Sequence, residues 1–169
     1  MRPKKNGFTT LELVSGVSVL SLISLVLVQS LLTTRTVWES SYTHAWLHTE
    51  ATRAANMMVK YIREGDPSSP IGITIDNDGK HITFAIPKEY NGTTVTEWRQ
   101  VEFSFDDQTG ELSKTIDGGP QTEVIGRLIS NCQFQQVSDR IHIALTTQTQ
   151  TAGNRALSIS LASQVTMRN

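Results

Sequence analysis

The sequence predicts an α+β protein, with one long N-terminal helix followed by a domain of antiparallel strands. Two observations predict this fold class. Between Thr33 and Glu64 the chain has neither Gly nor Pro, and its apolar residues recur at helical spacing. From Ile71 onward, short alternating segments are separated by turn-forming residues, which is typical of antiparallel strands. We therefore expect a helix packed on one face of an antiparallel sheet.

The composition bounds the size and the class of the protein. The 169 residues leave room for one domain and one membrane segment. The formal net charge of −1 gives no reason to expect nucleic-acid binding, which favours a clustered basic surface. The single cysteine, Cys132, excludes an intrachain disulfide. Because alternating residues follow Cys132, we expect it to be a small buried side chain in a strand, with a reactive thiol as the alternative.

The apolar segment at residues 8–32 is the first expected element and a candidate membrane-spanning half of the helix. It is longer than the roughly 20 residues that cross a hydrocarbon core, and residues 13–28 carry no charge. Arg2, Lys4 and Lys5 precede it, so the positive-inside rule predicts a cytosolic N-terminus and an extracytoplasmic domain. Two ordinary alternatives are an uncleaved anchor and a secretory signal with a passable cleavage site at residues 28–30.

Glu12 lies at the start of this apolar segment. A carboxylate within an apolar span costs on the order of a few kcal/mol unless something compensates its charge. The cost falls near the end of a span, but neither a secretory signal nor a plain anchor supplies a reason to keep the carboxylate. Glu12 therefore weighs against both alternatives.

Residues 4–12 read Lys-Lys-Asn-Gly-Phe-Thr-Thr-Leu-Glu and lead directly into the apolar segment. This arrangement resembles the class III signal of type IV pilins and type II secretion pseudopilins. In that family a prepilin peptidase cuts after the glycine and N-methylates the new terminal residue. The resemblance implies a leader at residues 1–7 with basic Lys4 and Lys5, cleavage after Gly7, and a methylated Phe8. It also implies that Glu12 pairs with the terminal amine of a neighbouring subunit as a filament assembles.

The second half of the helix, residues 33–64, is expected to be amphipathic and extracytoplasmic. Gly-Asp-Pro at residues 65–67 predicts its end. Many major pilins carry a helix-breaking proline at the position of Gln29, but none occurs between Pro3 and Pro67, so we expect no proline kink. The residues of the predicted apolar face are Val37, His44, Leu47, Ala51, Ala55, Met58 and Ile62.

Three aromatic residues, Trp38, Tyr42 and Trp46, form a second stripe on this helix at intervals of four residues. Bulky aromatic side chains just outside a bilayer often anchor at its interface. These three could equally pack on the domain's own sheet or against a neighbouring helix in a filament. The sequence leaves the three possibilities open.

The region of residues 65–169 is expected to be a β-rich domain. Asp-Asn-Asp-Gly at residues 76–79 predicts a hairpin turn, and residues 106–110, 118–120 and 138–139 contain further turn signals. The expected strands are 71–75, 81–86, 101–105, 111–115, 130–137, 140–147 and 155–167.

No residue pattern predicts a metal site, a cofactor or catalysis. Asp76, Asp78 and Gly79 fail the EF-hand pattern. Some major pseudopilins hold calcium in a loop, but turn chemistry explains the acidic residues at 106, 107 and 111 equally well. His44 and His48 have a spacing that can hold a metal, yet no third ligand is apparent nearby. The resemblance implies a substrate of prepilin peptidase and not an enzyme.

The resemblance leaves three functions from different classes. The first is a minor pseudopilin of a type II secretion system, in a filament with other pseudopilins; the strand-rich C-terminal half faintly resembles the J-type members. The second is a minor pilin of a type IV pilus or DNA-uptake machine. The third is a membrane-anchored extracytoplasmic binding module. In the first reading the chain crosses the inner membrane once and contacts lipid through residues 8–32. Glu12 argues against the terminal position at the filament tip, where the carboxylate is often lacking.

Overall fold

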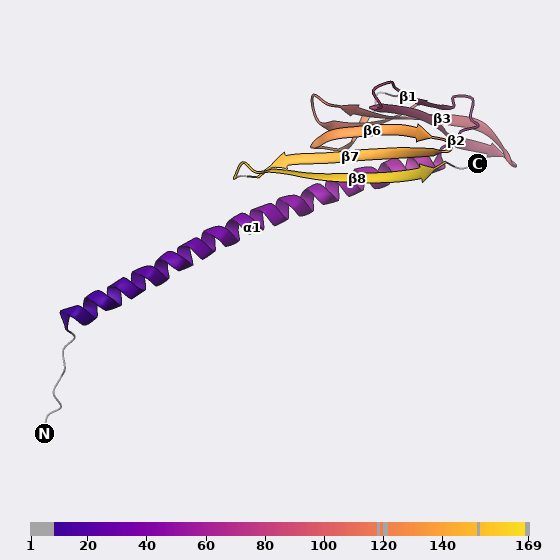
Figure 1. Ribbon diagram of the computed structural model, residues 1–169. Coiled ribbons are helices and arrows are strands. Elements are labelled where there is room, and N and C mark those ends of the chain that lie inside the picture. The colour runs from indigo at the N-terminus through magenta and orange to yellow at the C-terminus, as the bar shows by residue number, and fades with distance from the viewer. Residues whose placement is uncertain (1–8, 118, 120–121, 152, 168–169) are drawn as a thin grey trace. The chain divides into compact units, whose positions relative to one another are not determined.

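The computed structural model describes residues 9–117, 119, 122–151 and 153–167 and confirms the α+β fold class (Figure 1). Its described part contains one helix, α1 (Thr10–Glu64), followed by eight strands. The chain divides after Ser41 into two units. The first holds the N-terminal part of α1, and the second, the domain, holds the C-terminal part of α1 and all of the strands.

The helix α1 is one uninterrupted element of 55 residues, as the absence of proline predicts. It ends where expected: the amide of Gly65 donates to the carbonyl of Tyr61 at 3.1 Å, and Asp66 leaves the helix to donate its amide to Ala85 of the sheet at 3.1 Å. A Cβ atom at position 65 would lie 2.9 Å from the buried Phe84 ring and 3.1 Å from the Ile62 carbonyl oxygen, so glycine suits this close approach.

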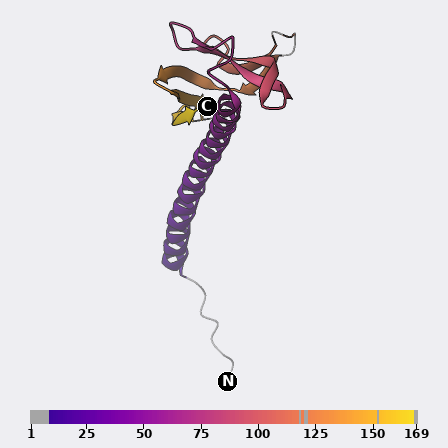
Figure 2. The same cartoon turned by 90° about the vertical axis from the view of Figure 1, so that its right-hand side faces the viewer.

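The strands form two antiparallel sheets, each with its strands in sequence order (Figure 2). Chain-adjacent strands joined by short turns need no crossover, which fits the local turn signals of the sequence. The five-stranded sheet contains β1 (Ile73–Ile75), β2 (His81–Asn91), β3 (Thr94–Asp106), β4 (Glu111–Ile116) and β5 (Thr122–Gly126). The three-stranded sheet contains β6 (Ile129–Val137), β7 (Arg140–Gln150) and β8 (Ala156–Thr166).

The predicted strands all exist, but the sequence analysis missed β5 and the outer halves of β2 and β3. Beyond Ile86, β2 continues to Asn91 and pairs with the start of β3, with register irregularities next to Glu89. Asn91-Gly92 at the turn, with Gly92 at φ 68°, is a strong hairpin signal that could have revealed this extension. The division of the strands into two sheets was not predicted either.

One core lies between the two sheets and the C-terminal part of α1. Its helical residues are Ala51, Ala54, Met58 and Ile62, and it includes Phe84 and Phe103 of the first sheet with Phe134 and Ile143 of the second. The predicted apolar face of α1 is therefore correct from Leu47 to Ile62, except that Ala54 is buried and Ala55 only partly so. The prediction was wrong for Val37 and His44, which are exposed, because burial on α1 begins only at Leu47.

Two turn glycines hold the sheets together along the edge of β6. The carbonyl of Gly79 accepts the amide of Phe134 at 2.7 Å, and the carbonyl of Gly110 accepts the amide of Ile129 at 3.0 Å. Both glycines have φ near +68°, and an added Cβ would lie 3.0 or 3.1 Å from a β6 carbonyl oxygen. Glycine permits both the left-handed conformation and the close approach.

A buried cation links α1 to the far edge of the five-stranded sheet. The Lys114 ammonium lies 2.6 Å from the Glu123 carboxylate, donates to the Tyr61 hydroxyl at 3.2 Å, and sits 4.6 Å from the centre of the Tyr61 ring. Burial opposes the charge of Lys114, but its hydrogen bonds to Glu123 and Tyr61 outweigh that cost and raise its pKa above 10.5. The contact connects β4, β5 and the helix through one side chain.

Candidate functional site

The N-terminal part of α1 is an exposed apolar surface. Every residue from Thr10 to Trp38 is exposed, and the segment from Leu13 to Thr34 contains no charged residue. By length and composition α1 can cross a membrane once. A soluble monomer rarely leaves so large an apolar patch in water. By its composition this segment suits lipid or another apolar surface.

The polar side chains of this segment hydrogen-bond within the helix. The hydroxyls of Ser18 and Ser21 donate to carbonyls four residues earlier at 2.9 and 2.8 Å. Those of Thr33 and Thr34 do the same at 2.9 and 2.8 Å. Such bonds satisfy hydroxyl groups without water. They let the Ser and Thr residues lie in a hydrocarbon environment at low cost.

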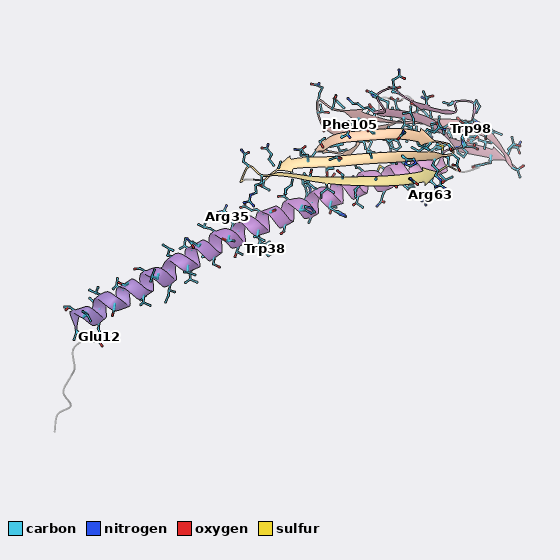
Figure 3. All side chains as sticks on the ribbon, viewed as in Figure 1. Glu12, Arg35, Trp38, Arg63, Trp98 and Phe105 are labelled. Carbon is cyan, nitrogen blue, oxygen red and sulfur yellow. The ribbon has the colours of Figure 1, made fainter. Side chains whose placement is uncertain are left out.

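Glu12 forms a reciprocal N-cap with Thr9 at the start of α1, where Figure 3 shows its side chain. The Thr9 amide and hydroxyl both donate to the Glu12 carboxylate at 3.2 Å, and the Glu12 amide donates to the Thr9 hydroxyl at 3.3 Å. This is a capping box, in which two side chains satisfy amides that the first helical turn leaves unpaired. The positive end of the helix dipole also favours a carboxylate here.

The sequence analysis missed the role of Thr9, although the signal was present. Thr9 and Glu12 have the Thr-x-x-Glu spacing of a capping box ahead of an apolar run. Within the part of the chain that the structure describes, no cation forms an ion pair with Glu12. The cap bonds account for the position of the carboxylate, and no cation of the described residues pairs with its charge.

The remaining predicted processing residues lie outside the described part of the chain. Gly7, Phe8, Lys4 and Lys5 precede Thr9, the first described residue. Cleavage after Gly7 would place the new amine directly before the capping residue. The structure therefore describes Glu12 but not the predicted cleavage point. The spacing of five residues between Gly7 and Glu12 comes from the sequence alone.

The aromatic stripe is exposed. Trp38 is 71% exposed and Tyr42 is 73% exposed. Packing on the domain's own sheet, one of the three possibilities, therefore does not apply to Tyr42. Trp46 is 42% exposed and lines a cavity of about 420 Å³ with Glu50, Arg53 and residues 124–128. At 1.5 Å per residue, Tyr42 lies roughly 15 Å along the helix from Leu32. That distance exceeds the headgroup layer of about 5–8 Å implied by bilayer dimensions. Trp38 lies roughly 9 Å along the helix from Leu32, at the outer edge of that layer, so of the three aromatic residues it is the nearest to a membrane interface.

The other candidate residues have structural roles. Cys132 is fully buried, as predicted, and burial raises the pKa of its thiol to about 12. Asp106 accepts the Gln108 amide at 2.8 Å, Asp107 pairs with Lys80 at 2.7 Å, and Glu111 pairs with Arg127 at 3.3 Å. The backbone bond from Gln108 lowers the pKa of Asp106, which is what turn chemistry predicts.

His44 and His48 are both exposed on the helix, and His48 contacts the Thr52 hydroxyl at 3.4 Å. Among the described residues, no group of three or more His, Cys, Asp or Glu side chains has the arrangement of a metal site. The two histidines therefore remain surface residues of α1.

A cavity of about 1060 Å³ lies in the domain between β1 with its following turn and the three-stranded sheet. No local pattern of the sequence predicts this cavity, because its walls come from segments far apart in the chain. Comparison of the chain with models of protein families, with curated proteins and with solved structures finds no match in any of the three.

Proposed function

We propose that this chain is a pilin-like structural subunit, a minor component of the filament of a type II secretion system. Prepilin peptidase removes residues 1–7 and methylates Phe8, and the mature chain enters the filament through the N-terminal part of α1. The observation that carries the proposal is the single carboxylate, Glu12, in the first turn of an exposed apolar helix without a cationic partner among the described residues.

The chemistry of Glu12 supports an intermolecular partner. Its capping bonds satisfy amides of the first turn, but they bring no positive charge to an ion that an apolar environment disfavours. Cleavage after Gly7 would create an amine at Phe8 and thus a cation at the same depth of the membrane. Its own helix repels that amine, because the helix N-terminus is already positive. The Glu12 carboxylate of a neighbouring chain offers the amine a compensating charge.

The same proposal gives the chain one orientation across the inner membrane. The basic leader stays in the cytosol, α1 crosses the inner membrane once, and the β-rich domain lies in the periplasm. The chain acts as a substrate of the peptidase and has no catalytic role of its own. Its partners are the peptidase, membrane lipid and other pseudopilins.

Mass analysis of the membrane-extracted protein tests the maturation step. The expected N-terminus is a methylated Phe8. An intact Met1, or a start at Leu31 after signal-peptidase cleavage, would contradict the proposal.

A second experiment tests the role of the carboxylate. Glu12→Gln keeps the shape of the side chain and removes its charge, so processing and membrane insertion should persist while filament entry is impaired. Glu64→Gln, an exposed carboxylate at the other end of α1, is the matched control. Pull-down with partner pseudopilins and a secretion assay measure the effect. Wild-type assembly of Glu12→Gln would remove this chain from the interior of the filament but leave the cleavage claim intact.

Deletion of the gene distinguishes the secretion system from a type IV pilus. Loss of protein secretion with normal piliation supports the pseudopilin assignment. Loss of pili or of DNA uptake with normal secretion would assign the chain to the pilus instead.

A further inference from the structure

The outer face of the three-stranded sheet forms the floor of the 1060 Å³ cavity. Alternate residues of β7 are buried from Ile141 to Thr147, so the intervening residues face outward. Strand register places outward residues of the three strands in line as two rows. One row is Gln135, His142 and Gln164, and the next is Gln133, Ala144 and Ala162.

The second row is a trough because two of its three side chains are methyl groups. Ala144 and Ala162 are directly paired and exposed. The neighbouring row stands higher, since it consists of two glutamines and a histidine whose Nδ1 lies 3.3 Å from the Gln164 amide. Rows on one face of a strand are roughly 6.7 Å apart. A chain molecule in extended conformation can therefore lie on the alanines with amides beside it.

The floor is rich in unused hydrogen-bonding groups. The side chains of Gln133 and Gln135 are exposed and make no hydrogen bond to any residue that the structure describes. A primary amide both donates and accepts, so it matches the alternating N–H and C=O groups of a polypeptide backbone. Both glutamines belong to β6: Gln133 stands at the β6 end of the trough, and Gln135 at the β6 end of the neighbouring row.

The wall of the cavity is acidic. It is formed by β1 and the turn at residues 76–79, which includes Asp76 and Asp78. Asp76 has no side-chain partner among the described residues, and Asp78 accepts only the Lys80 amide at 3.1 Å. The Lys80 ammonium bonds to Asp107 at 2.7 Å, and its charge interacts with Asp78 only at longer range. No lysine or arginine is among the described residues that line the cavity.

We propose that this cavity is a docking site for an extended, basic segment of another polypeptide. The segment lies along the alanine trough, its backbone bonds to the glutamine amides, and a lysine or arginine side chain reaches Asp76 and Asp78. Charge complementarity decides the class of ligand. The two carboxylates repel nucleic acid, a neutral glycan makes no use of their charge, and the floor is too polar to hold a membrane surface. The inference is independent of the filament proposal, since it concerns the domain alone.

A random decapeptide pool presented to the full-length protein in detergent micelles tests the proposal. The retained peptides should be enriched in Lys and Arg over the input pool. Replacing both wall carboxylates in Asp76→Asn/Asp78→Asn should weaken binding of a retained basic peptide about tenfold, because the charge-assisted bonds are lost. Asp139→Asn, an exposed carboxylate at the turn before β7, should leave binding unchanged.

Filling the trough tests its shape separately. Ala144→Leu/Ala162→Leu should abolish binding, while Ser158→Leu, also exposed on the outer face of β8 but outside the cavity, should not. Thermal unfolding monitored by circular dichroism identifies any variant that fails to fold, and the Asn variants then decide the question. A retained pool equal to the input, an acidic pool, binding unaffected by both sets of variants, or displacement by neutral dextran would each overturn the proposal.

Discussion

The two parts of α1 belong to one continuous helix, yet they suit different surroundings. From Thr10 to Ser41 no side chain is buried, whereas the part from Tyr42 to Glu64 contains five buried residues. The backbone hydrogen bonds of a helix are the same in both parts. The comparison shows that the distribution of side chains around the helix, and not its backbone, selects the environment.

The two parts of α1 differ in where their charged residues and their small residues lie. Between Leu13 and Leu32 the N-terminal part carries no charge and has apolar residues on all sides, which is typical of a segment surrounded by lipid. The C-terminal part restricts its apolar residues to one face and places alanines at the closest contacts. At one of these contacts a Cβ added to Gly126 of β5 would lie 3.0 Å from the Cβ of Ala54. Large side chains there would hold the sheet away from the helix.

The largest expected difference between the two parts concerns domain stability. Met58→Ala should lower the free energy of unfolding of the domain by about 2–5 kcal/mol, because Met58 is fully buried in the core. Leu25→Ala, in the exposed part, should leave it unchanged. Urea unfolding in detergent, followed by tryptophan fluorescence, measures both. An equal effect of the two variants would contradict the division of α1 into two environments.

A charge placed in the apolar part of α1 should affect membrane insertion and leave the stability of the domain unchanged. Leu20→Arg should weaken membrane insertion by about 2.5–3.5 kcal/mol, the cost of a charge at the centre of a spanning helix, without changing domain unfolding. Ser41→Arg is the control at an exposed position beyond the apolar segment. Alkaline extraction of membranes gives the fraction inserted. Full retention of Leu20→Arg would show that this segment does not span the bilayer.

The contact between Lys114 and Glu123 should make domain stability depend on pH. Its hydrogen bond from Lys114 lowers the pKa of Glu123 below 4.5, so its contribution is complete above pH 4.5 and is lost as the pH falls through the lowered value. The raised pKa of Lys114 removes its contribution only above pH 10.5. Glu123→Gln should cost about 1 kcal/mol, a small effect because Glu123 is half exposed. Unfolding curves from pH 3 to 7, compared with those of the variant, check this, and identical acid sensitivity would contradict it.

The smallest effect concerns the cap of the N-terminal part. Thr9→Ala should remove the hydroxyl from the capping box and cost about 0.5 kcal/mol of helix stability, confined to the first turn. Thr9→Ser keeps the hydroxyl and serves as the control. Amide hydrogen exchange in the first turn should accelerate in Thr9→Ala alone. Unchanged protection would mean that Glu12 does not depend on Thr9 for its position.

Features governed by neighbouring residues were predictable, and features governed by distant ones were not. The end of α1 at Gly65, the turn at residues 76–79 and the burial of Cys132 each follow from a short local pattern. The strand β5 was missed because its five residues, Thr122 to Gly126, show little alternation and are fixed by pairing with β4. Val37 and His44 continue the apolar spacing of α1 but are exposed, since spacing alone does not show where a core ends.

The sequence by itself determined the α+β class, the uninterrupted helix and the position of one carboxylate at the start of an apolar segment. Each depends on composition and spacing along the chain, which act within a few residues. Only the tertiary structure decided the division into two sheets, the joining of β6 to the turns at Gly79 and Gly110, and the cavity beside the paired alanines. These features arise from contacts between residues far apart in sequence. A pattern of neighbouring residues does not predict the geometry of such contacts.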